Sequence, residues 1–191
     1  MKNYTKTIII LLIVILGLFF LLHFFGETFM ASFSPDMQIS KDIKENTKVA
    51  VGSDAPYFDL PLVIGGRANS LDVRDNPLVL TFWSTWNSES VDQMKIFDDY
   101  LSSLTNENRE SSARILTITS QEIKSTVLNV LRRGGYKLEV LNDESGEIGN
   151  MYGIQTLPTT FFINREGKIL EIFVGTMSRT QLVDKMDKII R

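Results

Sequence analysis

The sequence predicts an α/β fold in which a mixed central sheet has helices on both faces and a β-hairpin extends its N-terminal side. Two apolar runs, at 78–83 and 159–163, have the length of buried strands, and the first leads into a segment with helical periodicity at 88–106. Strands and helices alternate between these runs, as parallel strands joined by helical crossovers require. We also expect one transmembrane helix near the N-terminus, because a long apolar stretch occurs there.

That stretch, at 8–25, contains no Asp, Glu, Lys or Arg and is interrupted only by Gly17 and His23. As a helix it would span roughly 27 Å, close to the thickness of a hydrocarbon core. It is longer than the apolar region of a typical signal peptide, so we expect an uncleaved anchor, with a cleaved signal as the alternative. Because Lys2 and Lys6 precede it, the positive-inside rule predicts a cytoplasmic N-terminus and an extracytoplasmic remainder, hence a single-pass protein of the cell membrane.

The chain divides into three expected parts. Residues 1–26 hold the cytoplasmic tip and the anchor, and residues 27–48 form a tether with little apolar periodicity. Residues 49–191 form the globular domain. This domain begins with the predicted hairpin, whose strands at 57–60 and 67–71 flank a turn that contains two glycines.

The remaining elements of the globular domain follow from periodicity and from turn residues. The strand at 78–83 is apolar throughout, as expected when both faces of a strand are covered. Apolar residues then recur every three or four positions over 88–106, which predicts a helix. The later predicted elements are strands at 114–119, 138–141, 159–163 and 168–174, and helices at 121–133 (with Ile123 among its buried residues), 144–152 and 179–190.

Composition excludes several classes of function. With 43% hydrophobic and 23% charged residues the chain can build an ordinary core. A net charge of −3, without a basic stripe, gives no indication of nucleic-acid binding. The sequence has no cysteine, and its one histidine is His23, in the predicted anchor. The sequence therefore lacks the residues that are needed for disulfides, thiol catalysis, zinc sites and histidine-based triads. No metal ion or other cofactor is predicted.

Four motifs carry a family resemblance: Phe-Trp-Ser-Thr-Trp at 82–86, Leu-Pro-Thr-Thr-Phe-Phe-Ile-Asn-Arg-Glu-Gly-Lys at 157–168, Gly-Thr-Met at 175–177, and Val-Gly-Ser-Asp-Ala-Pro at 51–56. With them, the chain resembles the membrane-anchored thiol-disulfide oxidoreductases of the ResA/TlpA type over most of its length. The resemblance implies a thioredoxin-like fold on the extracytoplasmic side. Enzymes of this family reduce disulfides, notably those of apocytochrome c before haem attachment.

The chain departs from that family where the family's chemistry takes place. The reaction needs Cys-x-x-Cys at the start of the first long helix, where the helix dipole stabilises a thiolate. Aligned on Trp86, the resemblance places Asn87 and Ser90 at the two cysteine positions and Gln93 at the position of a buried carboxylate. Neither Asn87 nor Ser90 can form a mixed disulfide, so we expect no catalytic residue here. Asn87 is well suited to cap the helix instead.

The corner can bind a peptide even without thiol chemistry. The resemblance implies a cis bond before Pro158, next to the former cysteine positions, with the backbone of Leu157 open to an extended peptide. Trp86 lies beside the same corner and is a candidate for contact with a partner, whereas Trp83 is expected in the core. The predicted binding residues are Trp86, Ser88, Leu157 and Pro158. Alternatively, Pro158 only shapes the entry into its strand.

Three hypotheses for function remain open. The favoured one is a membrane-tethered, non-catalytic module that binds an exported protein or peptide, for example in cytochrome c or envelope protein maturation. The second is a thiol-disulfide oxidoreductase whose two cysteines have been replaced. The third is a different enzyme that uses Glu89, Ser90 or Asp92, although a serine nucleophile needs an adjacent base.

Overall fold

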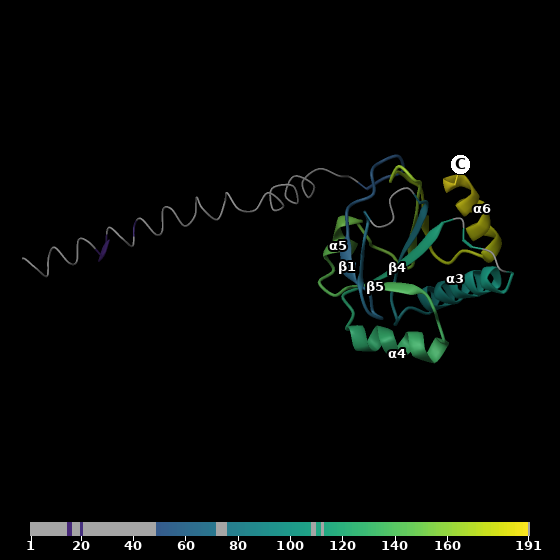
Figure 1. The fold of residues 1–191 in the computed structure, drawn as a ribbon, viewed down its shortest axis with the longest axis horizontal. Helices are drawn as coiled ribbons and strands as arrows, with labels where there is room; N and C mark the ends of the chain where they lie inside the picture. The colour runs from purple at the N-terminus through teal and green to yellow at the C-terminus, as the bar shows by residue number, and fades with distance from the viewer. Residues whose placement is uncertain are drawn as a thin grey trace, which may run out of the picture. The chain divides into compact units, whose positions relative to one another are not determined.

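A five-stranded mixed sheet with the strand order β5-β4-β3-β6-β7 lies at the centre of the fold (Figure 1). Strands β3 (Leu78–Trp83), β4 (Arg114–Ser120) and β5 (Glu139–Asp143) are parallel to one another. Strands β6 (Thr159–Ile163) and β7 (Ile169–Val174) continue the sheet in antiparallel fashion. Every residue of β3 and β6 is buried, as strands covered on both faces require. The mixed sheet predicted from the sequence is confirmed.

The structure is a computed structural model that describes residues 15, 16, 20, 49–71, 76–107, 110–111 and 113–190. Residues 47–191 form one compact unit. The predicted anchor and tether lie outside the described residues, except for Ile15, Leu16 and Phe20, which are helical. Within the described ranges, no helix has both the length and the apolar character needed to cross a membrane.

Three helices cover one face of the sheet: α3 (Ser88–Asn106), α4 (Lys124–Gly134) and α6 (Arg179–Ile189). Their apolar residues form one buried cluster with side chains of the sheet, among them Trp83, Phe97, Val127, Phe162 and Leu182. Trp83 is fully buried, as predicted. In the view of Figure 1, α3 and α6 lie close to each other and α4 runs along the bottom.

The opposite face is covered by the short helix α5 (Glu147–Met151) and by the hairpin of β1 (Asp59–Pro61) and β2 (Arg67–Asn69). The rings of Phe82, Tyr152 and Phe161 meet at the centre of this second cluster, with centroids 5.0–5.8 Å apart. Both the helices on two faces and the N-terminal hairpin agree with the sequence prediction.

Two helices start later than predicted, for reasons of local backbone geometry. Gln121 has a φ of 59° and donates its N–H to the carbonyl oxygen of Asp143 at 2.9 Å, so the helical turn cannot begin there. Ile123 becomes the N-cap of α4 and is 65% exposed, so its predicted burial was wrong. A turn at 144–145 and Gly146, with a φ of 75°, delay the start of α5 to Glu147.

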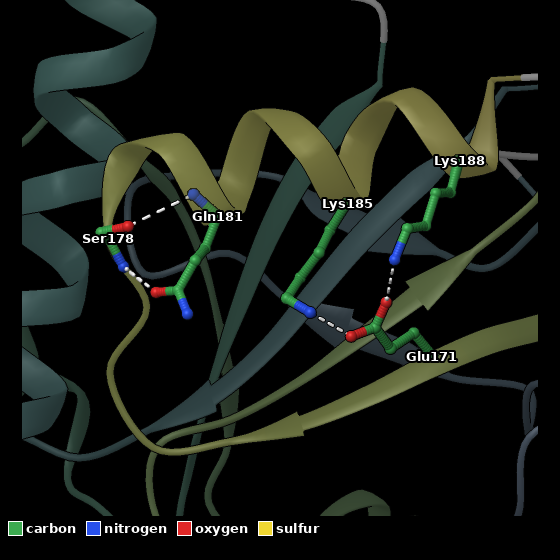
Figure 2. A network of polar contacts seen from close by, with 5 residues as sticks. All are labelled: Glu171, Ser178, Gln181, Lys185 and Lys188. Carbon is green, nitrogen blue, oxygen red and sulfur yellow. Dashed lines mark hydrogen bonds and ion pairs between the residues drawn. The ribbon is translucent and has the colours of Figure 1, made fainter.

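Helix α6 is fastened at both ends (Figure 2). A reciprocal capping box of Ser178 and Gln181 satisfies two backbone N–H groups at its start. Further along, Lys185 and Lys188 both form ion pairs with Glu171 of β7. The capping box thus stabilises the first turn of α6, and the two ion pairs hold its later turns against β7.

Candidate functional site

Asn87 connects the start of α3 to the segment before β6. Its side-chain Oδ1 accepts a hydrogen bond from the backbone N–H of Ser90 at 2.9 Å, which makes Asn87 the N-cap of α3, as predicted. Its Nδ2 donates to the backbone carbonyl oxygen of Leu157 at 3.2 Å. The Asn87 amide therefore accepts one hydrogen bond at the start of the helix through its oxygen and donates another across the site through its nitrogen.

The segment that receives this bond is a bend at residues 156–158 that leads directly into β6. The Leu157–Pro158 peptide bond is cis. Leu157 is partly exposed, whereas Pro158 is buried and its carbonyl oxygen accepts from the N–H of Gly175 at 2.8 Å. The structure thus brings together Asn87, Leu157 and Pro158, three residues singled out from the sequence.

Ser90 and Gln93 lie on the buried side of α3, each with no exposed surface. The Gln93 Oε1 accepts from the backbone N–H of Met177 at 2.7 Å. In the described part of the chain, the Ser90 Oγ and the Gln93 Nε2 have no hydrogen-bond partner. An amide and a hydroxyl therefore occupy the positions that the family resemblance assigns to a carboxylate and a thiol, and neither ionises at ordinary pH.

Glu122 belongs to this site but was not singled out from the sequence. Its Oε1 accepts from the backbone N–H of Thr85 at 2.8 Å, and the residue is only 8% exposed. This bond joins the loop after β3 to the loop after β4. A sequence signal existed, because Glu122 follows a strand parallel to β3, and the carboxyl ends of neighbouring parallel strands meet at one edge of a sheet.

The outer surface of this corner is formed by Trp86 and Ser88. The Trp86 side chain is 74% exposed, although it lies between Thr85 and Asn87, which are both fixed by hydrogen bonds. Ser88 is exposed in the first turn of α3. A second contact holds this turn, because the Thr176 Oγ1 donates to the carbonyl oxygen of Glu89 at 3.0 Å. The backbone that carries the Trp86 indole is therefore held in place by hydrogen bonds of the neighbouring residues.

The geometry does not assemble a serine-based catalytic pair. The Ser90 hydroxyl is buried and has no base within hydrogen-bond distance among the described residues. Glu89 and Asp92, the other candidates for a different chemistry, are exposed on α3. What the site does contain is a preformed surface made from four loops that side-chain hydrogen bonds hold together.

The order of the sheet and the α3 corner beside Pro158 define a thioredoxin-like protein. Residues 51–172 match the model of the AhpC/TSA family, and the chain belongs to that family. It is 32% identical over 145 residues to the thiol-disulfide oxidoreductase ResA of Geobacillus thermodenitrificans, covering 76% of this chain and 81% of the relative. It is 30% identical over 141 residues to ResA of Bacillus subtilis, covering 74% and 76% respectively.

Solved structures agree with this assignment. The exposed lipoprotein thioredoxin of Streptococcus pneumoniae superimposes with a TM-score of 0.61 at 25% identity, covering 69% of this chain and 98% of that one. A thiol:disulfide interchange protein of the thioredoxin family from Chlorobium tepidum gives a TM-score of 0.63 at 20% identity, covering 74% and 99%. The family resemblance seen in the sequence is therefore confirmed.

Proposed function

We propose that this protein is a redox-inactive member of the ResA-like thioredoxins that binds an exported protein or peptide. The observation that carries the proposal is the bonding of Asn87. At the position of the family's first cysteine, an amide caps α3 and also holds the carbonyl oxygen of Leu157. A residue that is engaged twice in neutral hydrogen bonds supports the structure of the corner, and it supplies no nucleophile.

The corner is nevertheless suited to binding. The loops after β3, β4 and β7 and the segment before β6 are joined by the hydrogen bonds from Thr85, Met177 and Asn87. A surface that is already ordered loses little conformational entropy when a partner binds. Trp86 supplies a large exposed aromatic group at this corner, and tryptophan is among the residue types enriched at the energetic centres of protein interfaces.

We place the domain on the extracytoplasmic side of a membrane, anchored through residues 8–25. The support is the charge-free apolar composition of that stretch and the two lysines that precede it. The partner is then an exported protein or peptide.

A disulfide-reduction assay tests the loss of redox activity. The full chain is expected to reduce insulin disulfides no faster than the background reaction, since it contains no thiol. The double variant Asn87→Cys/Ser90→Cys should fold and gain exchange activity, because both positions lie at the N-terminal end of α3. Activity of the thiol-free chain above background would refute the proposal.

Crosslinking in cells tests the binding role. A photoreactive amino acid at position 88, which is exposed beside Trp86, should give one reproducible exported adduct. The same adduct should be lost in Trp86→Ala and kept when an exposed residue on a distant element, Arg133 of α4, is changed to Ala. An adduct that forms equally well in Trp86→Ala would contradict a binding surface at this corner.

A further inference from the structure

We propose that the outer edge of β7 is an interaction surface for a second copy of this chain. The two β7 strands pair in antiparallel fashion about a twofold axis at Ile172 and join the two sheets into one. The inference goes beyond the proposed function and does not depend on it. It follows from the backbone groups, the apolar side chains and the charges along this edge.

The two edges of the central sheet differ in how they are covered. The N-terminal hairpin covers β5, where the Val63 N–H donates to the carbonyl oxygen of Val140 at 2.8 Å. At the other edge, Ile169 exchanges hydrogen bonds of 2.7 and 3.0 Å with residues 52–53. Among the described residues, no hydrogen bond from outside the sheet reaches the backbone of β7 beyond Ile169. The edge is therefore open over the rest of the strand.

The open backbone groups belong to alternate residues of β7. In an antiparallel pair, residues that exchange hydrogen bonds alternate with residues whose backbone groups face away from the neighbouring strand. The Gly175 N–H donates to the carbonyl oxygen of Pro158 at 2.8 Å, directly beyond the ladder of β6 and β7. The alternation therefore turns the N–H and the carbonyl oxygen of Ile172 and Val174 away from β6. The edge offers both donors and acceptors to another strand.

The side chains along this edge are apolar on one face. Leu170, Ile172 and Val174 occupy alternate positions of the strand and therefore lie on the same face. Leu170 is 39% exposed and Val174 is 57% exposed. Edge strands of monomeric proteins are usually protected by charged residues or proline, and these three positions carry neither. Such an edge is suited to pairing with another strand.

The sequence of β7 is complementary to itself. In a twofold antiparallel pair centred on Ile172, this residue lies opposite its own copy and exchanges both backbone hydrogen bonds with it. Leu170 then lies opposite Val174 of the second copy, and Val174 lies opposite Leu170. All three contacts on this face are apolar, so the pair covers the side chains that a single copy leaves exposed.

The charges on the other face select this register. Lys185 pairs with Glu171 (Figure 2), and its Nζ lies 4.8 Å from the centroid of the Phe173 ring. With the axis at Ile172, Glu171 lies opposite Phe173 of the second copy and close to the second Lys185. An axis at Phe173 would bring the two lysines together, and an axis at Glu171 would bring two carboxylates together. Like charges opposite each other destabilise a strand pair.

Two double variants of the full chain test this pairing. Leu170→Glu/Val174→Lys places opposite charges at both contacts between positions 170 and 174, whereas Leu170→Lys/Val174→Lys places two lysines at each. Both variants change only exposed side chains, so both should fold, which circular dichroism checks. The lysine variant has a net charge of −3 + 2 = −1, so weaker overall repulsion would favour its association.

Sedimentation equilibrium in detergent micelles measures the association. We expect the native chain and the Glu/Lys variant to dimerise, and the Lys/Lys variant to associate at least about tenfold more weakly than the Glu/Lys variant. Amide hydrogen exchange at Ile172 and Val174 should slow as the native protein concentration rises, because these N–H groups enter the interface.

Three results would overturn the inference. The first is a native chain that stays monomeric at its highest soluble concentration. The second is equal association of the two double variants, which would place any dimer contact elsewhere in the chain. The third is slow exchange at Ile172 and Val174 in the monomer, which would mean that another segment of the same chain covers the edge. The proposed function is unaffected by each of these results, because its tests address Trp86 and Asn87.

Discussion

The side chain of Gln93 in α3 accepts a hydrogen bond from the backbone N–H of Met177 at 2.7 Å, and both residues are buried. Met177 directly precedes Ser178, the N-cap of α6. The bond therefore fixes the start of one helix against the first turns of another, at the position where the family resemblance indicates a carboxylate. A neutral amide makes this contact without the cost of burying a charge.

Replacement of Gln93 by leucine should destabilise the fold, because the buried N–H of Met177 would lose its acceptor. We expect the free energy of unfolding to fall by about 1–3 kcal/mol, the usual cost of an unpaired buried polar group. Urea denaturation measures this change. The matched control is Gln155→Leu at an exposed position, which should have little effect. Equal stability of the Gln93 and Gln155 variants would show that the bond to Met177 contributes nothing.

Asn87 offers a second test, because its two hydrogen bonds can be removed separately. Asn87→Ala removes both the cap and the bond to Leu157 and should lower the free energy of unfolding by about 0.5–2 kcal/mol or slightly more. Asn87→Ser keeps the cap and should lose less. Denaturation midpoints of the two variants provide the comparison. A serine variant that is as unstable as the alanine variant would contradict the role of the cap.

The order of elements was predictable from the sequence because periodicity and turn residues agree along the chain. The strand at Leu78–Trp83 and the helix at Ser88–Asn106 have the predicted bounds. The start of α4 was not predictable, because it depends on the left-handed backbone of Gln121 and its bond to Asp143 in the neighbouring strand. That contact is tertiary, and no local pattern reports it.

The site was only partly predictable, for the same reason. Asn87 as an N-cap follows from residue type and position, and the structure confirms it. Its second bond, to Leu157, joins residues 70 positions apart and depends on how the loops meet. The buried carboxylate of Glu122 was missed because a single acidic residue at a helix start normally faces solvent.

Ser90 should be replaceable by alanine without loss of stability. Its hydroxyl is fully buried and has no partner in the described part of the chain, so its removal eliminates an unsatisfied polar group. We expect Ser90→Ala to equal or exceed the native free energy of unfolding. Thr81→Val is the contrasting variant, since the Thr81 hydroxyl lies 3.0 Å from that of Thr160 and its loss leaves a buried group unpaired. Destabilisation by Ser90→Ala would reveal a contact of this hydroxyl.

Glu171 should make the stability of the fold dependent on pH. Partial burial raises the pKa of Glu171, but the hydrogen bond and charge of Lys185 and the charge of Lys188 lower it more, so the folded-state pKa lies below 4.5. A carboxyl whose pKa is lower in the folded state stabilises that state above its ordinary pKa. This contribution is lost as the pH falls through the folded-state value.

The substitution Glu171→Gln should therefore reduce the free energy of unfolding by about 1 kcal/mol near neutral pH. The difference from the native chain should shrink as the pH falls below 4.5, because the native carboxyl is then protonated as well. Urea denaturation over a pH series measures both effects. The control is Glu166→Gln in the exposed turn between β6 and β7, which should follow the native curve. A Glu171 deficit that stays constant into the acidic range would mean that the loss comes from packing, since only the ionised carboxyl can pair with Lys185 and Lys188.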